Sequence, residues 1–335
     1  MALGQLGFDH GRSCADSEAR FNDAQTLGDA VGRLVAQAQM VAFCGNPVRA
    51  LAGLKEVVKA DPGSIAAPVF LARLQRQEGH GDGARKSLGG VLRRQPPPPS
   101  ALLERAHLHR DRGQLRRADD DYAAFQRSAP WPRGVYDGAM GRAVTALRAG
   151  DAERAKSHVG VAEAALGETP EVLWLRGRVA MDGGTPEGAE RAAEALEALD
   201  AVKVTRRSRA FSLHLRGRLA LERGDLQTAV GSFYDAVAER TPETGLFILE
   251  LAGALDAAGE PERAIDTLSQ WLETWPLHAP ALCALSAFEA RRGRRDHALK
   301  LSRRAFEFWS DESGELAMRE CKRRKRELEI GSDPR

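Results

Sequence analysis

Two stretches of the chain, LRGRVAMDGG at residues 175–184 and LRGRLALERG at residues 215–224, are near copies of one another. Each runs through helix-forming residues to a glycine, Gly184 or Gly224, and an alanine follows five residues later. A glycine placed between two such runs is typical of a point where one helix ends and another begins. A duplicated pair of this kind predicts a repeat protein, so the same spacing should recur along the chain.

The glycine-to-alanine spacing recurs eight times. Successive alanines are separated by 34, 34, 37, 34, 40, 35 and 34 residues. Glycine supplies only 33 of 335 residues, so eight matches at a single offset do not arise from composition. The pairs are Gly45/Ala50, Gly79/Ala84, Gly113/Ala118, Gly150/Ala155, Gly184/Ala189, Gly224/Ala229, Gly259/Ala264 and Gly293/Ala298.

Two further positions keep their character in every repeat. A small residue stands twelve positions before each alanine: Ala38, Ala72, Ala106, Ala143, Gly177, Gly217, Ala252 and Ser286. An apolar residue stands seven positions after it: Val57, Val91, Phe125, Ala162, Leu196, Ala236, Trp271 and Ala305. The pattern predicts a helical hairpin in which the small residue and the alanine let two antiparallel helices approach closely. The apolar residues then pack against the next hairpin, so stability is a sum of contacts between neighbours.

Prolines support the predicted end of the second helix, because proline does not continue a helix beyond its first turn. Pro62, Pro96, Pro130 and Pro276 lie twelve residues past the repeat alanine, and Pro242 lies one residue later. The two longest spacings coincide with residues 131–134 and with residues 200–208. We interpret these two stretches as loop insertions.

The combination of small residue, glycine, alanine, apolar residue and proline at a period of 34 residues resembles the tetratricopeptide repeat (TPR) family, over roughly residues 32–311. The resemblance implies an all-α, right-handed solenoid of about eight helix-turn-helix repeats, with the first helix of each repeat lining a concave groove. It divides the chain into a loose segment at 1–22, a repeat array at 23–311, and a basic capping helix and tail at 312–335. It also implies a protein-binding scaffold without catalytic activity.

Composition agrees with a folded all-α chain, since 43% of residues are hydrophobic, 29% are charged and only 6% are aromatic. The net charge of +2 does not demand a nucleic acid or a membrane as partner. Cys14, Cys44, Cys283 and Cys321 show no paired spacing, so we expect neither a disulfide framework nor a zinc site. Without a recognisable signal segment or a long apolar run, we expect a cytoplasmic protein. The abundance of Ala and Arg with little Lys suggests a GC-rich bacterial genome.

The sequence shows no catalytic, cofactor-binding or metal-binding pattern. The stretch at residues 79–87, GHGDGARKS, has Arg85 where a phosphate-binding loop requires glycine, so we interpret it as a turn between two helices. His107 and His109 lie two apart on a predicted helix and point to different faces, which does not suit a shared metal ion. We therefore expect no enzyme activity, no cofactor and no metal.

The resemblance indicates which side chains would face the groove. They are five arginines, two histidines and three aromatic or apolar residues, on the second and third repeats and on or directly before the two stretches quoted above: Arg73, Arg76, His107, Arg110, Trp174, Arg178, Met181, His214, Arg218 and Leu221. Guanidinium groups bind carboxylates through two parallel hydrogen bonds, and Trp supplies buried area. These residues favour an acidic partner segment, although some of the arginines are also expected to pair with acids on the next helix.

Other partners fit the sequence less well. The TPR subclass that captures chaperone tails carries Lys and Asn four residues apart, whereas this chain has pairs such as Val35 with Gln39 and Trp174 with Arg178. The basic run at residues 322–326 is interrupted by acids on both sides, which favours a solvated cap over an RNA or membrane contact. An RNA-binding repeat and a docking module for a separately encoded enzyme remain the alternatives, with nucleic acid ranked lower. An array with open ends is also able to self-associate.

Overall fold

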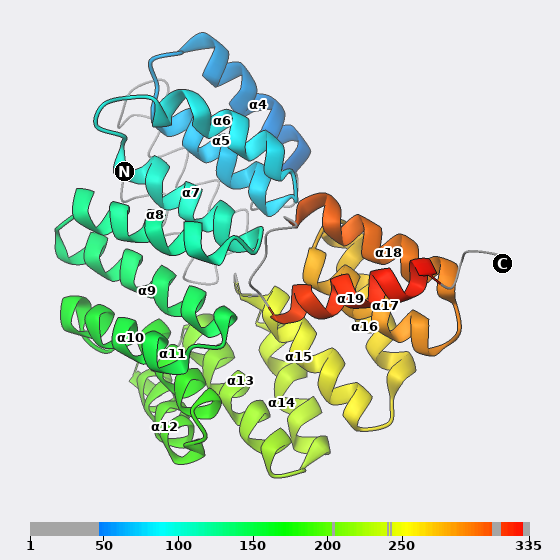
Figure 1. The fold of residues 1–335 in the computed structure, drawn as a ribbon. Coiled ribbons are helices and arrows are strands. Elements are labelled where there is room, and N and C mark those ends of the chain that lie inside the picture. The colour runs from blue at the N-terminus through cyan, green and yellow to red at the C-terminus, as the bar shows by residue number, and fades with distance from the viewer. Residues whose placement is uncertain (1–46, 203–204, 240, 242, 310–315, 331–335) are drawn as a thin grey trace. The chain divides into compact units, whose positions relative to one another are not determined.

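The computed structural model describes residues 47–202, 205–239, 241, 243–309 and 316–330, which form helices joined by short turns (Figure 1). Within these ranges there are sixteen helices, α4 to α19, and no strand. The predicted all-α solenoid built of consecutive hairpins is confirmed. Ala38, Gly45, the expected loose segment at 1–22 and the predicted boundary at 311/312 lie outside the described residues.

The described residues fall into two compact units, one ending at Leu108 and the other beginning at His109. The first unit contains the second helix of repeat one, both helices of repeat two and most of the first helix of repeat three. Its core joins Leu54 and Leu71 in one cluster and Val69, Leu88 and Leu108 in another. The helices are α4 (Pro47–Ala60), α5 (Ala66–Gln77), α6 (Gly81–Leu92) and α7 (Pro99–Asp111), whose last turn belongs to the second unit.

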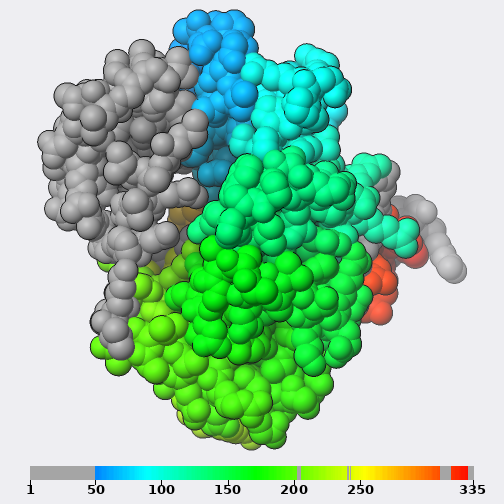
Figure 2. All heavy atoms as spheres, turned by 90° about the vertical axis from the view of Figure 1, so that its left-hand side faces the viewer, coloured from blue at the N-terminus to red at the C-terminus, as the bar shows by residue number. Residues whose placement is uncertain are grey.

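The second unit continues the same hairpin pattern, with each helix packed against its neighbour in the chain. Its helices are α8 (Leu115–Ser128), α9 (Pro132–Ala149), α10 (Ala152–Leu166), α11 (Pro170–Asp182), α12 (Pro186–Val202), α13 (Arg206–Glu222), α14 (Leu226–Ala238), α15 (Thr244–Ala257), α16 (Pro261–Thr274), α17 (Ala279–Arg291), α18 (Arg295–Phe308) and α19 (Leu316–Ile330). In the space-filling view α8 to α12, drawn in green, form one closely packed surface (Figure 2). The odd-numbered helices α9, α11, α13, α15 and α17 are the first helices of repeats four to eight.

The repeated glycines end the first helix of each hairpin, as predicted. The seven that lie in the described residues have φ between 71° and 80°, the left-handed region that other residues resist: Gly79, Gly113, Gly150, Gly184, Gly224, Gly259 and Gly293. The residue after each glycine donates its N–H to a carbonyl five positions back, as Asp225 does to Ala220 over 2.9 Å. This bond satisfies a carbonyl that the helix end would leave without a partner. The second helix then begins two residues after each of the seven glycines.

The small residues and the repeat alanines meet inside the hairpins. All eight repeat alanines are at most 1% exposed. A Cβ atom on Gly217 would lie 2.7 Å from Cε1 of Phe233, and one on Gly177 would lie 2.5 Å from Cδ1 of Leu215. Even an alanine would therefore be too large at these two positions, which explains why repeats five and six use glycine.

The two predicted loop insertions are wrong, because the extra residues lengthen helices. Trp131 precedes α9, and Pro132 occupies its first turn, where a proline needs no N–H partner. That helix has 18 residues, against 13 in α7 and α11. Residues 200–202 continue α12 and residues 206–208 begin α13, and each of these helices has 17 residues.

The last helix covers the end of repeat eight. Met318 and Cys321 of α19 are buried in the same core as Leu282 and Ala305. A disulfide joins Cys321 to Cys283 of α17, whose Cα atoms are 5.8 Å apart. Our expectation of unpaired cysteines is therefore wrong for these two, because the pairing spans 38 residues and only the packing of α19 on α17 brings them together. In the described part of the chain no helix is both long and apolar enough to cross a membrane.

Candidate binding face on the first helices

Charged and aromatic side chains of the second unit gather on one side of its first helices. On α11, Glu171, Trp174, Arg178 and Asp182 follow at spacings of three or four residues, which places them on one side of the helix. On α13, residues 207, 211, 214 and 218 repeat the pattern. We call this the first-helix face, defined by these residues together with Tyr136 and Arg148 of α9 and Glu243, Phe247 and Glu250 at and along α15.

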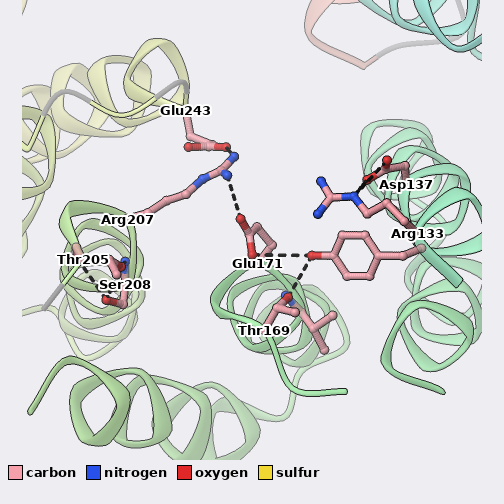
Figure 3. Close-up of polar contacts among 10 residues, drawn as sticks. Arg133, Asp137, Thr169, Glu171, Thr205, Arg207, Ser208 and Glu243 are labelled. Atoms are coloured by element: carbon pink, nitrogen blue, oxygen red, sulfur yellow. Dashed lines mark hydrogen bonds and ion pairs between the residues drawn. The ribbon is translucent and has the colours of Figure 1, made fainter. Parts of the chain in front are cut away.

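A polar ladder crosses the beginnings of these helices (Figure 3). Arg207 donates from Nη1 to Oε1 of Glu171 over 2.6 Å and from Nη2 to Oε1 of Glu243 over 2.5 Å. The hydroxyl of Tyr136 lies 2.8 Å from Oγ1 of Thr169 and 3.5 Å from Oε2 of Glu171. Burial raises the pKa of Tyr136 to about 12, and the charge of Glu171 adds to the rise. The ladder therefore links four repeats through alternating acidic and basic groups.

Helix caps hold the ladder residues in place. Thr169 accepts the backbone N–H of Val172 over 3.2 Å, and Pro170 occupies the first turn, so α11 begins at a defined residue. Thr205 accepts the backbone N–H of Ser208 over 3.1 Å in the same way. Each threonine lies directly before its helix and two residues before the charged residue. Glu171 and Arg207 therefore both fall in the first turn of their helices.

A buried aromatic cluster lies one to two turns further along. Trp174 stacks on Phe211 with ring centroids 4.5 Å apart and an interplanar angle of 7°. Its Nε1–H donates to Nδ1 of His214 over 3.1 Å. Since Nδ1 accepts, the proton of a neutral His214 sits on Nε2, which lies 3.9 Å from Oε1 of Glu250. Burial lowers the pKa of His214, which favours this neutral form.

Three arginines and three carboxylates lie near one another on the first helices α7, α9, α11, α13 and α15. Arg218 donates from Nη2 to Oδ1 of Asp182 over 2.9 Å. Arg148 lies 3.7 Å from Oδ1 of Asp111. Arg178 stands over the ring of Trp174, 5.1 Å from the centroid, and no carboxylate of the described residues lies within 4.0 Å of it. Burial lowers the pKa of Arg178, and Arg218 and Arg148 act in the same direction, while Glu250 and Asp182 oppose it.

The structure separates the ten predicted binding residues into different environments. In the first unit, Arg73 and Arg76 donate to the two oxygens of buried Glu104 over 3.1 and 2.7 Å, and His107 lies 3.8 Å from the same carboxylate. Burial would raise the pKa of Glu104, but Arg76, His107 and Arg73 hold it well below its usual range. These three side chains therefore stabilise the packing of α5 and α7 in the first unit.

The remaining predicted residues lie in the second unit. Arg110 donates to Asp111 over 3.0 Å. Trp174, Met181 and His214 are buried, and Met181 packs with Ala189 and Leu219. Leu221 is partly buried against the core of repeats six to eight. Arg178, Arg218, Trp174 and His214 are brought together on the first-helix face. A role for these residues in binding a partner stays a prediction.

Sequence reasoning missed Glu104, Glu171, Arg207 and Glu250. A signal for two of them exists: Glu171 and Arg207 are 36 residues apart, about one repeat, and each follows a threonine by two positions. Complementary charges at equivalent places of successive repeats indicate a pairing between neighbouring hairpins. Among the residues that the structure describes, His, Cys, Asp and Glu form no group suited to hold a metal ion.

Comparisons with known proteins agree with this architecture. A family model described as tetratricopeptide repeat matches residues 45–108, and a second with the same description matches residues 214–279. No curated protein sequence matches the chain.

Several solved structures are similar to this chain. The APC/C hetero-tetramer Cut9–Hcn1 is 17% identical over 93% of this chain, with a TM-score of 0.53, and the chain spans 60% of that protein's length. A monomeric mutant of IFIT1 with Gppp-AAAA is 16% identical over 97% of this chain and 80% of its own, with a TM-score of 0.52. A tetratricopeptide repeat protein from Parabacteroides merdae is 15% identical over 90% of this chain and 100% of its own, with a TM-score of 0.48. The two matching models identify tetratricopeptide repeats at residues 45–108 and 214–279, within a succession of similar hairpins.

Proposed function

We propose that the protein is a non-catalytic scaffold that binds an acidic segment of a partner polypeptide along its first-helix face. Tetratricopeptide repeats support a protein-interaction scaffold in general. The observation that carries the more specific proposal is that first helices from four successive repeats present charged groups side by side, from Arg148 to Glu250. A segment lying across these helices would contact several repeats at once.

The arginines indicate that the partner segment is acidic. Arg178 and Arg218 lie on neighbouring first helices, and guanidinium groups recognise carboxylates with defined geometry. Arg218 already pairs with Asp182, so a partner acid would have to share or replace that contact. Binding is therefore expected to depend on salt concentration, since the groups are only half-buried.

A photo-crosslinking experiment tests which surface is used. A photoreactive amino acid replaces Leu221, which lies on a first helix and is partly buried, in one variant. In the matched control it replaces Tyr234, which is 61% exposed on the second helix α14. Illumination in the producing cells, followed by mass spectrometry, should yield a discrete protein adduct from position 221 and none from position 234. Adducts from position 234 alone, or from neither position, would contradict the proposal.

RNA is the competing ligand, because two of the similar structures are of IFIT1 with capped Gppp-type oligonucleotides. At 16% identity that likeness extends to the fold alone. Here Arg73, Arg76 and Arg218, three of the five arginines predicted to bind a partner, are each already engaged by a carboxylate. Filter binding of a labelled single-stranded RNA at two salt concentrations tests this ligand directly, because phosphate contacts would retain the RNA at low salt and release it steeply as salt is added.

A further inference from the structure

Arg178 differs from the other arginines of the first-helix face because no carboxylate of the described residues lies within 4.0 Å of its guanidinium group. Arg148 and Arg218 lie 3.7 and 2.9 Å from Asp111 and Asp182 respectively. The Nε atom of Arg178 is buried and has no hydrogen-bond acceptor among the described residues. An N–H group that is withdrawn from water without an acceptor carries an energetic cost, which a ligand oxygen would remove.

The support beneath Arg178 is rigid. Its guanidinium carbon stands 5.1 Å from the centre of the Trp174 ring. That ring is held on one side by Phe211, at 4.5 Å between centroids, and at its edge by His214 through a 3.1 Å hydrogen bond. All three supporting side chains are at most 6% exposed. A stacked guanidinium loses little freedom when it binds an anion, so the site is arranged in advance of binding.

The surrounding charges select a monoanion. Three arginines in this cluster, Arg148, Arg178 and Arg218, face three carboxylates, Asp111, Asp182 and Glu250. Two of the carboxylates are already paired with arginines, and Glu250 is 3.9 Å from Nε2 of His214. Arg178 therefore has room for one carboxylate of a ligand, and Glu250 and Asp182 would repel a phosphate dianion more strongly than a monoanion.

From this geometry we infer that Arg178, stacked on Trp174, receives one carboxylate of a partner polypeptide, an Asp or Glu side chain, through two hydrogen bonds from its guanidinium group. The inference rests on the proposed function in that the carboxylate belongs to the bound segment. Beyond the proposed function, it states where the bound segment is anchored, by how many groups, and that the anchoring group is a carboxylate. A phosphorylated segment or an RNA is an alternative occupant that the experiment below distinguishes.

The first test observes Arg178 directly. Spectra of arginine side-chain N–H groups in the full chain are recorded while N-acetylglutamate amide is added, and the Arg178 signal is assigned by its loss in Arg178→Lys. The Arg178 signal should move and reach saturation, whereas N-acetylglutamine amide should leave it in place. Arg176, two residues away on the same helix and paired with Glu168, serves as the control signal. Equal movement of both signals, no movement, or a stronger response to inorganic phosphate would overturn the inference.

The second test uses peptides selected on the intact protein from a random library. Replacing the critical Asp or Glu of a selected peptide by its amide should weaken binding about tenfold, and Arg178→Lys should do the same. The two changes together should weaken binding no further than either alone, because they remove one contact. Glu250→Gln should strengthen binding, since it removes a repelling charge and keeps an oxygen for His214; a purely structural role of Arg178 predicts no such gain.

The outcomes separate this inference from the proposed function. Peptides that bind equally well without an acid and to Arg178→Lys would refute the inference and leave the scaffold proposal standing. A saturable response of Arg178 to the glutamate derivative without any selected peptide would refute the scaffold proposal and support the carboxylate site. Thermal unfolding of each variant is measured in parallel, so that a weakened fold is recognised before binding is compared.

Discussion

Trp174 and His214, 40 residues apart in the chain, are joined by a 3.1 Å hydrogen bond from the indole N–H to Nδ1 of the imidazole. The bond requires His214 to keep Nδ1 free of a proton. Protonation of His214 would turn this acceptor into a donor that faces another donor. The packing of α11 against α13 is therefore coupled to the protonation state of one buried side chain.

Stability should fall as the pH is lowered below about 6.5, the ordinary pKa of histidine. Burial lowers the pKa of His214 in the folded state, so the unfolded chain binds a proton first and acid favours unfolding. Burial also lowers the pKa of His278, to about 4, which adds a second contribution of the same sign. The slope for each group approaches about 1.4 kcal/mol per pH unit, the value for uptake of one proton.

Urea unfolding at a series of pH values measures this effect, with His214→Asn as the control that cannot titrate. The variant should be less stable near neutral pH and should lose less stability than the wild type as the pH falls. Parallel pH curves for the two proteins would show that His214 does not titrate as argued.

Gly217→Ala should destabilise the array by about 1–3 kcal/mol, the range for overpacked cores. The added methyl group would meet the ring of Phe233 at 2.7 Å, and Phe233 is fully buried. Gly231→Ala is the matched control, because that glycine lies in the middle of α14 with nothing within 4 Å of the new atom. The control should gain about 0.5–1 kcal/mol from the better helix propensity of alanine. Equal effects of the two changes in thermal unfolding would contradict the close packing described at Gly217.

Arg207→Met should cost about 1–2 kcal/mol, more than the ~0.2–1 kcal/mol typical of an exposed ion pair. It removes two short contacts at once and leaves Glu171 and Glu243 facing each other without the cation between them. Arg209→Met provides the comparison, because Arg209 is 61% exposed and has a single acidic partner in the described part of the chain, Glu239 at 3.2 Å. Denaturant unfolding at low and high salt should show the larger loss for Arg207, and a loss no greater than that of Arg209 would refute the ladder's contribution.

Reduction of the Cys283–Cys321 disulfide should destabilise α19 on α17. Closing a loop of 38 residues stabilises the folded state by about 3–4 kcal/mol in the chain-entropy account. Hydrogen exchange of residues 316–330 should accelerate on adding a reductant. In a variant with serine at both positions, exchange should be fast with or without reductant. Recovery of both cysteines as alkylated thiols from the unreduced protein would show that the bond does not form.

The fold could be predicted from the sequence because its main determinants are local. A left-handed glycine and a buried alanine five residues later are each required by the hairpin itself. The pair seen at Gly224 and Ala229 therefore recurs in every repeat with the same spacing. The insertions were predicted wrongly for an equally local reason. A longer spacing between repeats does not tell a loop from a longer helix, and Pro132 in the first turn of α9 replaces no hydrogen bond, so that helix gains length.

The candidate site could be predicted only in part. The helix period indicates that Trp174, Arg178 and Arg218 share a face, but burial depends on the neighbouring repeat. Trp174 is covered by Phe211 and His214, which lie 37 and 40 residues further along the chain. Which arginine lacks a carboxylate depends on the relative register of successive first helices. Asp182 therefore reaches Arg218, and Arg178 has no acid within 4.0 Å among the described residues, a difference that the two nearly identical sequence stretches do not reveal.

The ladder of Glu171, Arg207 and Glu243 imposes an order on the repeats. The charges alternate from one hairpin to the next, with each acid two repeats away from the other. If the hairpin that carries Arg207 were deleted, Glu171 and Glu243 would become neighbours and repel. Loss or duplication of a single repeat by mutation would therefore destabilise this part of the array. Loss or gain of two repeats would keep acidic and basic residues alternating.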